Sequence, residues 1–514
     1  MKKLFVFIAI LTCTKGYTLY AQEIFNQSVL HEIHLNFQQQ GWYDTLAQYY
    51  IDAADGSSRK YLPVKMNIDG VDIKNDAGIR FKGEYSYTGF PGKKKPFRIH
   101  FNKIKSSQDY QGIKKINLHN LAGDPSFLRE YVSYGLLRSM GIPASRTSFT
   151  KLYINNTYWG CYLIVEEPED NLFLKQNFGS KDGNLIEAAA TTRLNWKGNT
   201  PSSYPELKLQ TDESDSSWSK VIQWIDFFNN NFAYNFQLEF YKLFNAEEYF
   251  KILAADVFLN NWDSYANNGR NFFLYDDPVS KKIRWIPWDY NLSMWKNDLA
   301  LLPKDGNSSY TYKPLIWRIS ENAMLKQTYF ISFCHLLDSS FSKYPVEEKT
   351  LAAFNLIKEA VEADTLKFYT NDDFYNNRTE TVTVKMLRDN MLRDVSLPGI
   401  TTLFKNRITM LRQELLSNGC NCDNKTEDNL PALSARVFPN PAVAATTLYL
   451  DEYPALRQAV SIKIYNTTGQ LIKELQANSI QGKISLDMAL LQSGVYYLKI
   501  VATGKKAIIP VIKK

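Results

Sequence analysis

The sequence predicts an α+β protein in which a large two-lobed body is followed by a small all-β sandwich. Residues 23 to about 120 alternate apolar and polar positions between turn signals, a pattern typical of strands. Beyond about residue 215 the chain reads mostly helical, interrupted by one strand pair at 271–287. Short alternating runs return after a polar, turn-rich stretch at 418–435. Strands followed by helices indicate two lobes rather than a repeat.

The N-terminal residues have the pattern of a secretory signal peptide. Two lysines follow Met1, an apolar run extends from Leu4 to Leu11, and the small residue Ala21 stands at the expected cut. That run is well short of the roughly 20 residues of a membrane-spanning helix, and no later stretch is apolar enough to be one. The predicted organisation is a signal peptide at 1–21, a body at 22–417, a linker at 418–436 and a C-terminal domain at 437–514.

The charge distribution excludes a nucleic-acid binder. The net charge is +7, but the leader holds three lysines, and residues 437–514 hold nine Lys and Arg against four Asp and Glu. The body is therefore close to neutral and lacks the basic footprint that binding to nucleic acid requires.

Four cysteines remain beyond the leader. Cys161 and Cys334 lie in apolar surroundings, which predicts inert core thiols. Cys420 and Cys422 lie in the polar stretch that ends the body, and a bridge formed in an oxidising compartment is one interpretation of them. No His or Cys cluster stands nearby in the sequence, so a zinc site is not expected.

Turn signals place the strands of the first lobe. Asp69-Gly70 predicts a hairpin, Asp76-Ala77-Gly78 a further turn, and Asn155-Asn156 a turn between two later strands. Residues 94–102 are expected to form a strand whose alternate positions share one apolar face, Phe97, Ile99 and Phe101.

One helix of the first lobe is marked at both ends. We expect it over 124–141, with Asp124 as its cap and Pro125 in its first turn. Gly141 is placed to end it, because glycine adopts the left-handed conformation that often follows a helix.

The stretch 257–295 gathers the residues that indicate chemistry. An apolar helix end runs into Asp263, Asn268 follows at a spacing of five, and Asp289 directly follows the predicted strand pair. The hairpin between them folds back on itself, so we expect Asp289 to lie beside Asn268. Oxygen ligands of this kind suit a hard cation such as Mg²⁺.

This spacing meets the needs of phosphoryl transfer. The reaction requires a carboxylate that accepts the proton of the attacking hydroxyl, and oxygen ligands that hold Mg²⁺ against the nucleotide phosphates. In protein kinases an Asn follows the base Asp after five residues, and the metal-binding Asp comes later in the chain. Asp263 and Asn268 have the first spacing, and Asp289 follows later.

Six short runs occur in order between about residues 60 and 415. They are RFKG at 80–83, KKPFRI at 94–99, DPSFLR at 124–129, GCYLIVE at 160–166, NFFLY at 271–275 and IPWD at 286–289. Together they resemble the CotH family of protein-kinase-like phosphotransferases, named for a spore-coat protein. The resemblance implies a protein-kinase-like body, ATP and Mg²⁺ as cofactors, and transfer of phosphate to a serine or similar hydroxyl of a protein substrate.

The resemblance also assigns roles to the acidic stretch. Asp263 corresponds to the catalytic residue, Asp289 to the metal-binding aspartate, and Asn268 to a second metal ligand, with Asn267 or Asn271 as alternatives. The sequence departs from the family two positions after the Pro-Trp-Asp, where the family usually has a second aspartate. Here that position is Asn291, which weakens the negative field expected to hold a cation.

A lysine is expected on the phosphate side of the nucleotide. Lys95 begins the strand that follows the glycine-containing loop 83–92, where a kinase has its phosphate-binding lysine. Lys93, Lys94 and Arg98 compete with it, and Arg98 alternates onto the face opposite the apolar residues of that strand.

Two glutamates complete the predicted nucleotide site. Glu130, on the helix expected over 124–141, is placed to pair with that lysine, whereas its neighbour Arg129 is an alternative phosphate ligand. Glu166 ends a strand and is predicted to lie near the adenine.

The C-terminal domain has its own signature. It contains FPNP at 438–441, IYNTTGQ at 464–470 and LQSGVYY at 491–497, and it ends on two lysines. This ordered set resembles the C-terminal sorting domain of type IX secretion cargo, an immunoglobulin-like sandwich. The resemblance implies recognition by the type IX secretion machinery and a secreted or cell-surface location.

The leading interpretation is therefore an exported kinase-like enzyme that acts with Mg-ATP on a surface or secreted protein. The alternative is a non-catalytic surface protein, a pseudokinase or adhesin, on the same scaffold. Serine and zinc hydrolases lack support, because the five histidines show no pair at metal or triad spacing and no G-x-S-x-G run is present. Abundant aromatic and acidic residues alone do not establish a carbohydrate-active protein.

Overall fold

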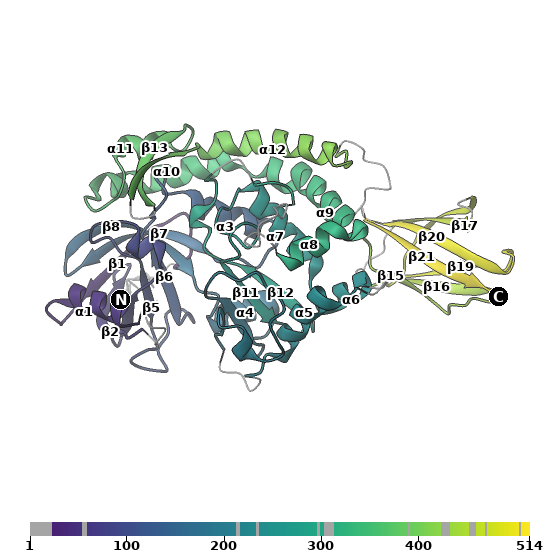
Figure 1. Ribbon diagram of the computed structural model, residues 1–514, viewed down its shortest axis with the longest axis horizontal. Helices are drawn as coiled ribbons and strands as arrows, with labels where there is room; N and C mark the ends of the chain where they lie inside the picture. The colour runs from purple at the N-terminus through teal and green to yellow at the C-terminus, as the bar shows by residue number, and fades with distance from the viewer. Residues whose placement is uncertain are drawn as a thin grey trace, which may run out of the picture.

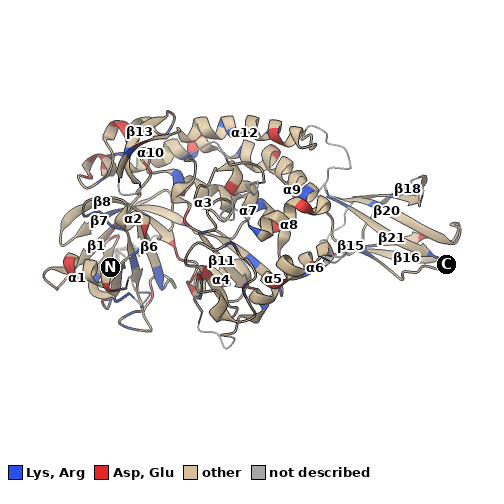
Figure 2. Ribbon diagram, in the orientation of Figure 1, with Lys and Arg blue, Asp and Glu red and all other residues tan. Residues whose placement is uncertain are grey.

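A computed structural model describes most of the chain. The described residues are 23–53, 59–211, 216–232, 236–295, 299–302, 313–388, 391–422, 432–451, 459–467, 470–502 and 505–514. The predicted signal peptide at 1–21 lies outside them. Figure 1 shows a strand-rich N-terminal part, a helical middle part and a separate all-β part at the C-terminus. Acidic and basic residues are interspersed over the body (Figure 2).

The N-terminal part is a closed β-barrel. Its sheet has the strand order β1-β7-β8-β6-β5-β4-β2-β3, and β1 also pairs with β2, so that Ile33 lies opposite Ile68. The strands are β1 (Leu30–Asn36), β2 (Leu62–Ile68), β3 (Val71–Asp72), β4 (Ala77–Phe81), β5 (Phe97–His100), β6 (Lys115–His119), β7 (Thr147–Ile154) and β8 (Thr157–Glu166). The mixed α+β class is confirmed, whereas the predicted first lobe takes the form of a barrel.

Alternation explains how the barrel is filled. Phe97 and Ile99 of β5 and Leu118 of β6 point into the barrel core and are fully buried. The residues between them, Arg98 and Asn117, face the other way, toward the middle part of the body, and are paired across the two strands. The barrel therefore presents polar side chains to its neighbour.

Two of the three predicted turns are confirmed. β2 and β3 meet at Asp69-Gly70, and β7 and β8 meet at Asn155-Asn156, with positive φ at all four residues, as a two-residue hairpin turn requires. The turn expected at Asp76-Ala77-Gly78 is wrong. Ala77 and Gly78 belong to β4, because Ala77 is completely buried in the barrel core.

The predicted helix begins later than expected. Helix α3 spans Arg129–Ser139, so Pro125 precedes its first turn. Asp124 nevertheless supplies a cap, because its Oδ2 accepts a hydrogen bond of 2.7 Å from the backbone N–H of Arg129. The intervening residues form a tight loop in which Phe127 has positive φ.

The middle part of the body consists of helices around a four-stranded sheet of order β10-β9-β11-β12. The confirmed strand pair is β11 (Phe272–Asp276) with β12 (Ile283–Pro287), beside β9 (Leu185–Ala188) and β10 (Leu207–Leu209). The helices include α4 (Asn171–Phe178), α5 (Ser219–Asn230), α6 (Phe236–Leu243), α7 (Ala246–Phe258), α8 (Pro314–Glu321), α9 (Ala323–Leu336), α10 (Val346–Ala363), α11 (Asn371–Asn376) and α12 (Ile400–Ser417).

Further elements join the barrel to the middle part. Helix α10 packs against β8 and α3, and α12 packs against α7, α9 and α10, so these long helices run along one side of the body (Figure 1). A hairpin of β13 (Val382–Arg388) and β14 (Met391–Leu397) lies beside α11. Helices α1 (Trp42–Asp52) and α2 (Tyr85–Thr88) belong to the barrel side, and α2 lies within the loop between β4 and β5.

The C-terminal part is all-β. Its two sheets have the orders β15-β16-β19 and β18-β17-β20-β21 and share one apolar core that includes Leu448, Ile462 and Leu498. The strands are β15 (Ala435–Phe438), β16 (Ala445–Leu450), β17 (Ala459–Asn466), β18 (Leu471–Asn478), β19 (Lys483–Asp487), β20 (Gly494–Ala502) and β21 (Lys505–Lys513). Among the described residues, no helix has the length and apolar character needed to cross a bilayer.

The body ends at a cluster of three cysteines. Cys334 of α9 and Cys422 form a disulfide, which corrects the expectation that Cys334 is a free core thiol. Cys420 is a buried thiol, as is Cys161, and the Sγ of Cys420 lies 3.6 Å from that of Cys334. The bridge fastens the residues after α12 to α9.

Removing this disulfide is expected to destabilise the body by ~2–4 kcal/mol, because the bridge closes a long loop of the unfolded chain. Cys334→Ser leaves no bridge to α9, whereas Cys422→Ser leaves Cys334 next to Cys420, which can replace the lost partner. We therefore expect Cys422→Ser to lose less of the free energy of unfolding than Cys334→Ser, as measured by urea denaturation. Peptide mapping without reductant checks the replacement; free Cys334 and Cys420 thiols in Cys422→Ser would contradict it.

Candidate functional site

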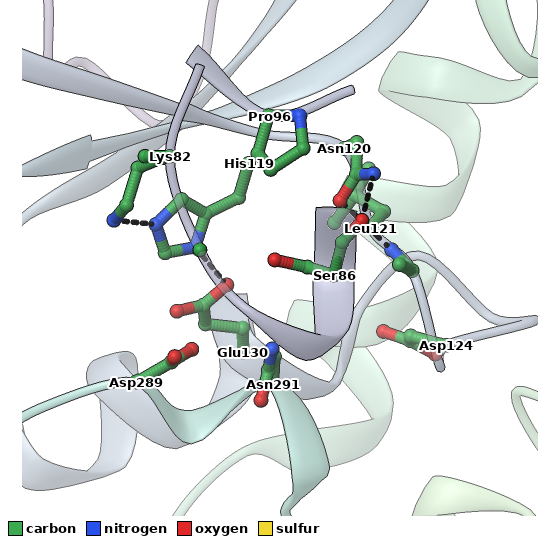
Figure 3. Close-up of a pocket in the computed structure, with 12 residues that line it drawn as sticks. Lys82, Ser86, Pro96, His119, Asn120, Leu121, Asp124, Glu130, Asp289 and Asn291 are labelled. Carbon is green, nitrogen blue, oxygen red and sulfur yellow. Dashed lines mark hydrogen bonds and ion pairs between the residues drawn. The ribbon is translucent and has the colours of Figure 1, made fainter. Parts of the chain in front are cut away.

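A polar cavity lies where the barrel meets the middle part of the body. Figure 3 shows side chains from the barrel, from α3 and from the chain after β12 converging on it. Its lining residues are Lys82, Gly83, Ser86, Pro96, His119, Asn120, Leu121, Ala122, Asp124, Glu130, Asp289 and Asn291.

The ends of four elements bring the ionisable side chains together. Lys82 directly follows β4, His119 is the last residue of β6, Glu130 lies in the first turn of α3, and Asp289 comes shortly after β12. Asp289 has a φ of 52°, a conformation that is uncommon for a residue with a side chain and that often occurs at functional sites.

A chain of three side chains forms one wall of the cavity. Lys82 Nζ lies 3.0 Å from His119 Nε2, and His119 Nδ1 lies 2.8 Å from Glu130 Oε2. Burial lowers the pKa of Lys82 and lowers the pKa of His119 to about 3, and it raises the pKa of Glu130 to about 8. Lys82 Nζ also lies 4.9 Å from the ring centre of Trp288.

Asp289 lies opposite this chain. Its burial, and then the neighbouring carboxylate of Glu130, raise its pKa to about 6, while His119 and Lys82 act in the other direction. Its backbone N–H donates to the hydroxyl of Tyr134 on α3 at 3.0 Å. The backbone of Asp289 is therefore fixed against α3, and its carboxylate interacts with ionisable groups of the barrel.

The carboxylates offer unused ligand atoms. Ligand atoms of His119, Glu130 and Asp289 all lie within 4.8 Å of one another. Glu130 Oε1 and Asp289 Oδ1 are buried and have no hydrogen-bond partner among the described residues. Two such oxygens fit a hard divalent cation, whereas both nitrogens of His119 are already in contact with Lys82 and Glu130.

Asp263 is held by two amides. Its Oδ1 accepts from Asn268 Nδ2 at 2.9 Å, and its Oδ2 accepts from Asn271 Nδ2 at 3.0 Å. It also interacts electrostatically with Asp289, so the structure brings these residues into one neighbourhood. Asn268 contacts Asp263 directly, and its Oδ1 accepts from Asn267 Nδ2 at 3.3 Å. Its predicted role as a metal ligand stays a prediction.

Asp256 of helix α7 holds residues close to Asp263 and Asp289. Tyr290, next to Asp289, donates from its hydroxyl to Asp256 Oδ1 at 2.5 Å, and Asn261 Nδ2 donates to the same oxygen at 3.1 Å. Burial raises the pKa of Asp256 from its ordinary value of 3.8 to about 7. Asp256 thus positions Asn261, which precedes Asp263, and Tyr290, which follows Asp289.

The predicted lysine lies outside the cavity. Lys95 Nζ donates to the backbone carbonyls of Tyr87 and Phe90 at 2.7 and 2.8 Å and closes the loop between β4 and β5. Lys82 occupies the position toward the carboxylates instead. Lys94 is fully buried in an ion pair of 2.5 Å with Asp364.

The remaining predicted nucleotide ligands are engaged in ion pairs. Arg98 Nη2 lies 2.7 Å from Glu167 Oε2 and 2.6 Å from Glu169 Oε2. Glu166 accepts from Nε and Nη2 of Arg146, at 3.0 and 2.7 Å. Glu167, the residue after β8, accepts a hydrogen bond of 2.9 Å from Asn117 Nδ2, so Glu167 rather than Glu166 faces the middle part of the body.

Arg129, the alternative phosphate ligand, is also committed. It is fully buried, and its guanidinium donates to Asp124 Oδ1, Asn377 Oδ1 and the carbonyl of Pro398, each at 2.7 Å. Of the residues predicted for the nucleotide, Glu130 alone lines the cavity.

Lys82 and His119 were missed by the sequence reasoning. Alternation contained a signal for both. Ile116 and Leu118 fill the barrel, so His119 shares the opposite face of β6 with Asn117. Phe81 likewise points into the barrel core, which turns Lys82 the other way.

Fold and site together define an α+β protein with a barrel, a helical part and a buried acidic and basic cluster between them. Residues 79–392 match the family described as CotH kinase protein, and the chain belongs to this family. Residues 436–514 match the secretion system C-terminal sorting domain. The sorting domain indicates export and attachment to the cell surface, which agrees with the predicted secreted or cell-surface location, and it implies the type IX secretion machinery.

Similar proteins occur in bacteria and fungi. The chain is 25% identical to inner spore coat protein H of Bacillus subtilis over 285 residues, which are 54% of this chain and 75% of that protein. It is 23% identical to spore coat protein homolog 1 and 21% identical to invasin CotH3, both of Rhizopus delemar. These matches cover 41% and 51% of this chain but 36% and 47% of the Rhizopus proteins.

Among solved structures, latent PorU of Porphyromonas gingivalis shares 17% identity with this chain. The similarity covers 26% of this chain and 12% of PorU, with a TM-score of 0.14.

Stability is expected to depend on pH through Asp256. Because its pKa is higher in the folded than in the unfolded chain, the folded protein binds more protons between pH 3.8 and about 7. Stability should therefore fall as pH rises through this window, by on the order of 2–4 kcal/mol. Asp256→Asn stays neutral and should remove the part of the fall in the free energy of unfolding that Asp256 causes, whereas Asp44→Asn, at an exposed position of α1, should keep it. Glu130 and Asp289, whose pKa values burial also raises, contribute to the fall in both variants. Parallel pH profiles for Asp256→Asn and wild type would contradict this role.

Proposed function

We propose that the protein is an exported phosphotransferase that moves the γ-phosphate of ATP to a hydroxyl, most simply that of a serine, on a surface or secreted protein. The observation that carries the proposal is the cluster of Lys82, Glu130 and Asp289 around one cavity, with Asp263 in the same neighbourhood. Membership of a family described as kinases supports it.

The cavity residues divide the work of holding nucleotide and metal. Glu130 and Asp289 supply the buried oxygens for Mg²⁺, which would draw negative charge away from the phosphates when bound. Lys82 supplies a cation to the phosphates, and His119 links it to Glu130. In protein kinases a lysine pairs directly with the glutamate of a helix, and here the histidine stands between the two. We infer that the barrel and the middle part act as the two lobes of a kinase-like body.

Asp263 is the proposed general base. Two amides orient its carboxylate without neutralising it, and its negative charge attracts the proton of an acceptor hydroxyl. As that proton passes to Asp263, the hydroxyl oxygen forms a bond to the γ-phosphorus, and the bond from phosphorus to the bridging oxygen of ADP breaks. Arg270 pairs with Glu84 at 2.8 Å. It also interacts electrostatically with Asp263 and Asp289.

A second candidate is a non-catalytic surface protein on the same scaffold. Asn291, at the position where the family usually has an aspartate, lines the cavity and brings no charge to it (Figure 3). Three of the Rhizopus relatives carry the name invasin. In this alternative the cavity does not bind nucleotide in the presence of a divalent metal ion.

Two aspartate variants separate the candidates. Asp289→Asn should lose both Mg²⁺-dependent binding of ATP and transfer of labelled phosphate, because it removes a metal ligand. Asp263→Asn should keep binding within about threefold and lose transfer by about 100-fold or more, because it removes only the base. Glu166→Gln, which affects a glutamate paired with Arg146, serves as the control and should keep both. Calorimetry and a filter assay measure the two properties; a wild type that binds no nucleotide with Mg²⁺ would favour the second candidate.

The two lysines provide a matched comparison. Lys82→Met removes the cation beside Glu130 and Asp289 and should lower the rate of transfer by about 100-fold. Lys95→Met removes hydrogen bonds to two loop carbonyls and should change the rate less than about tenfold while lowering the melting temperature. Rates and melting curves are measured on both proteins. A larger loss of rate in Lys95→Met than in Lys82→Met would restore Lys95 to the site.

A further inference from the structure

A second hollow lies on the far side of the loop that borders the cavity. This groove has a volume of about 420 Å³, within the range of ligand-binding clefts. Its walls are the loop residues 89–93, the residues 365–368 after α10, and the β13–β14 hairpin. The lining residues are Gly89, Phe90, Pro91, Gly92, Lys93, Thr365, Leu366, Lys367, Phe368, Lys385, Met386, Leu387 and Leu392.

The groove shares its structure with the cavity. Residues 82–96 form a single connection between β4 and β5 whose two ends border the cavity and whose middle, residues 89–93, borders the groove. On the opposite wall, Tyr369 follows the groove residue Phe368. Its hydroxyl accepts a hydrogen bond from the backbone N–H of Gly123, which lies in the segment between β6 and α3 that also borders the cavity. A chain lying in the groove is therefore adjacent to the proposed site of phosphate transfer.

The walls of the groove are fixed to one another. The buried ion pair between Lys94 and Asp364 joins the loop to the end of α10. Tyr85 donates from its hydroxyl to the carbonyl of Leu387 at 3.0 Å and joins the same loop to the hairpin. The rings of Phe90 and Phe368 lie 5.0 Å apart. The groove is thus preformed, which reduces the entropy lost when a partner binds.

The groove is apolar at its base and positively charged at its rim. Its lining contains three lysines and no acidic residue. Lys93 is exposed and has no ion pair within the described part of the chain, and Lys367 Nζ donates to the carbonyl of Asp364 at 2.9 Å. Lys385 pairs with Asp394, but both side chains are exposed, so the pair is weak. Asp364 itself is occupied by Lys94.

The hairpin offers a surface for an extended chain. In the described part of the body, β13 and β14 pair only with each other, which leaves backbone groups at their outer edges. Met391 and Leu392, where β14 begins, are 55% and 64% exposed. An extended peptide that pairs with such an edge presents alternate side chains to one face.

We propose that this groove binds an extended segment of the acceptor protein in which acidic and apolar residues alternate. The apolar side chains enter the groove, and the acidic ones meet Lys93 and Lys367. The proposal rests on the proposed phosphotransferase function, since it names the acceptor that the same site would modify.

The test measures binding without nucleotide, so it does not depend on catalysis. The probe is a fluorescein-labelled peptide in which aspartate and leucine alternate on both sides of one serine, and fluorescence anisotropy gives its affinity for the full-length protein. We expect Lys93→Glu combined with Lys367→Glu to weaken binding by about tenfold or more. The control combines Lys65→Glu with Lys208→Glu, two exposed barrel and β10 positions, and should stay within about twofold.

Two further measurements keep the result decisive. Lys93→Glu alone, at an exposed position that supports no described contact, should weaken binding by about threefold. A peptide with lysine in place of aspartate should bind the wild type at least about tenfold more weakly. Equal affinity of wild type and the double groove variant for the acidic peptide, or equal binding of both peptides, would overturn the groove. If the wild-type protein binds the acidic peptide but transfers no phosphate, the groove stands and the proposed phosphotransferase function is overturned.

Discussion

The architecture depends on burying charged side chains where the barrel meets the middle part of the body. An unpaired charge in such a place costs several kcal/mol, so each group that enters the interface needs a partner. Arg98 of β5 has Glu167 and Glu169, and His119 of β6 has Lys82 and Glu130. This matching stabilises the interface and at the same time creates a polar cavity. Among the described residues, one oxygen of Glu130 and one of Asp289 have no hydrogen-bond partner, so the matching is incomplete at this point.

The local part of the fold was predictable because side chains alternate along strands. Phe97 and Ile99 mark a buried face without any knowledge of the partner strand, and Asn155-Asn156 marks a turn through its own conformational preference. Closure of the barrel was not predictable, because the pairing of β1 with β2 and β7 joins residues far apart in the chain. The disulfide between Cys334 and Cys422 is a long-range contact of the same kind.

In the candidate site, too, local contacts could be predicted and long-range contacts could not. Asp263 and Asn268 are close in sequence, and their contact is one that a spacing argument can find. The lysine was harder, because Lys82, Lys94 and Lys95 stand on one loop and differ only in the direction that folding gives each side chain. Lys94 reaches Asp364, Lys95 turns back to the carbonyls of its own loop, and Lys82 reaches the acidic cluster. Each direction depends on contacts from distant segments, which no local pattern contains.

The bridge between Cys334 and Cys422 also determines how the body ends. The disulfide joins Cys422, which follows α12, to Cys334 of α9. The sorting domain begins after this point, at residue 436. A protease that cuts the chain beyond Cys422 therefore releases the C-terminal domain but leaves the last turn of α12 tethered. Separation of the C-terminal domain would therefore leave the end of the body joined to α9.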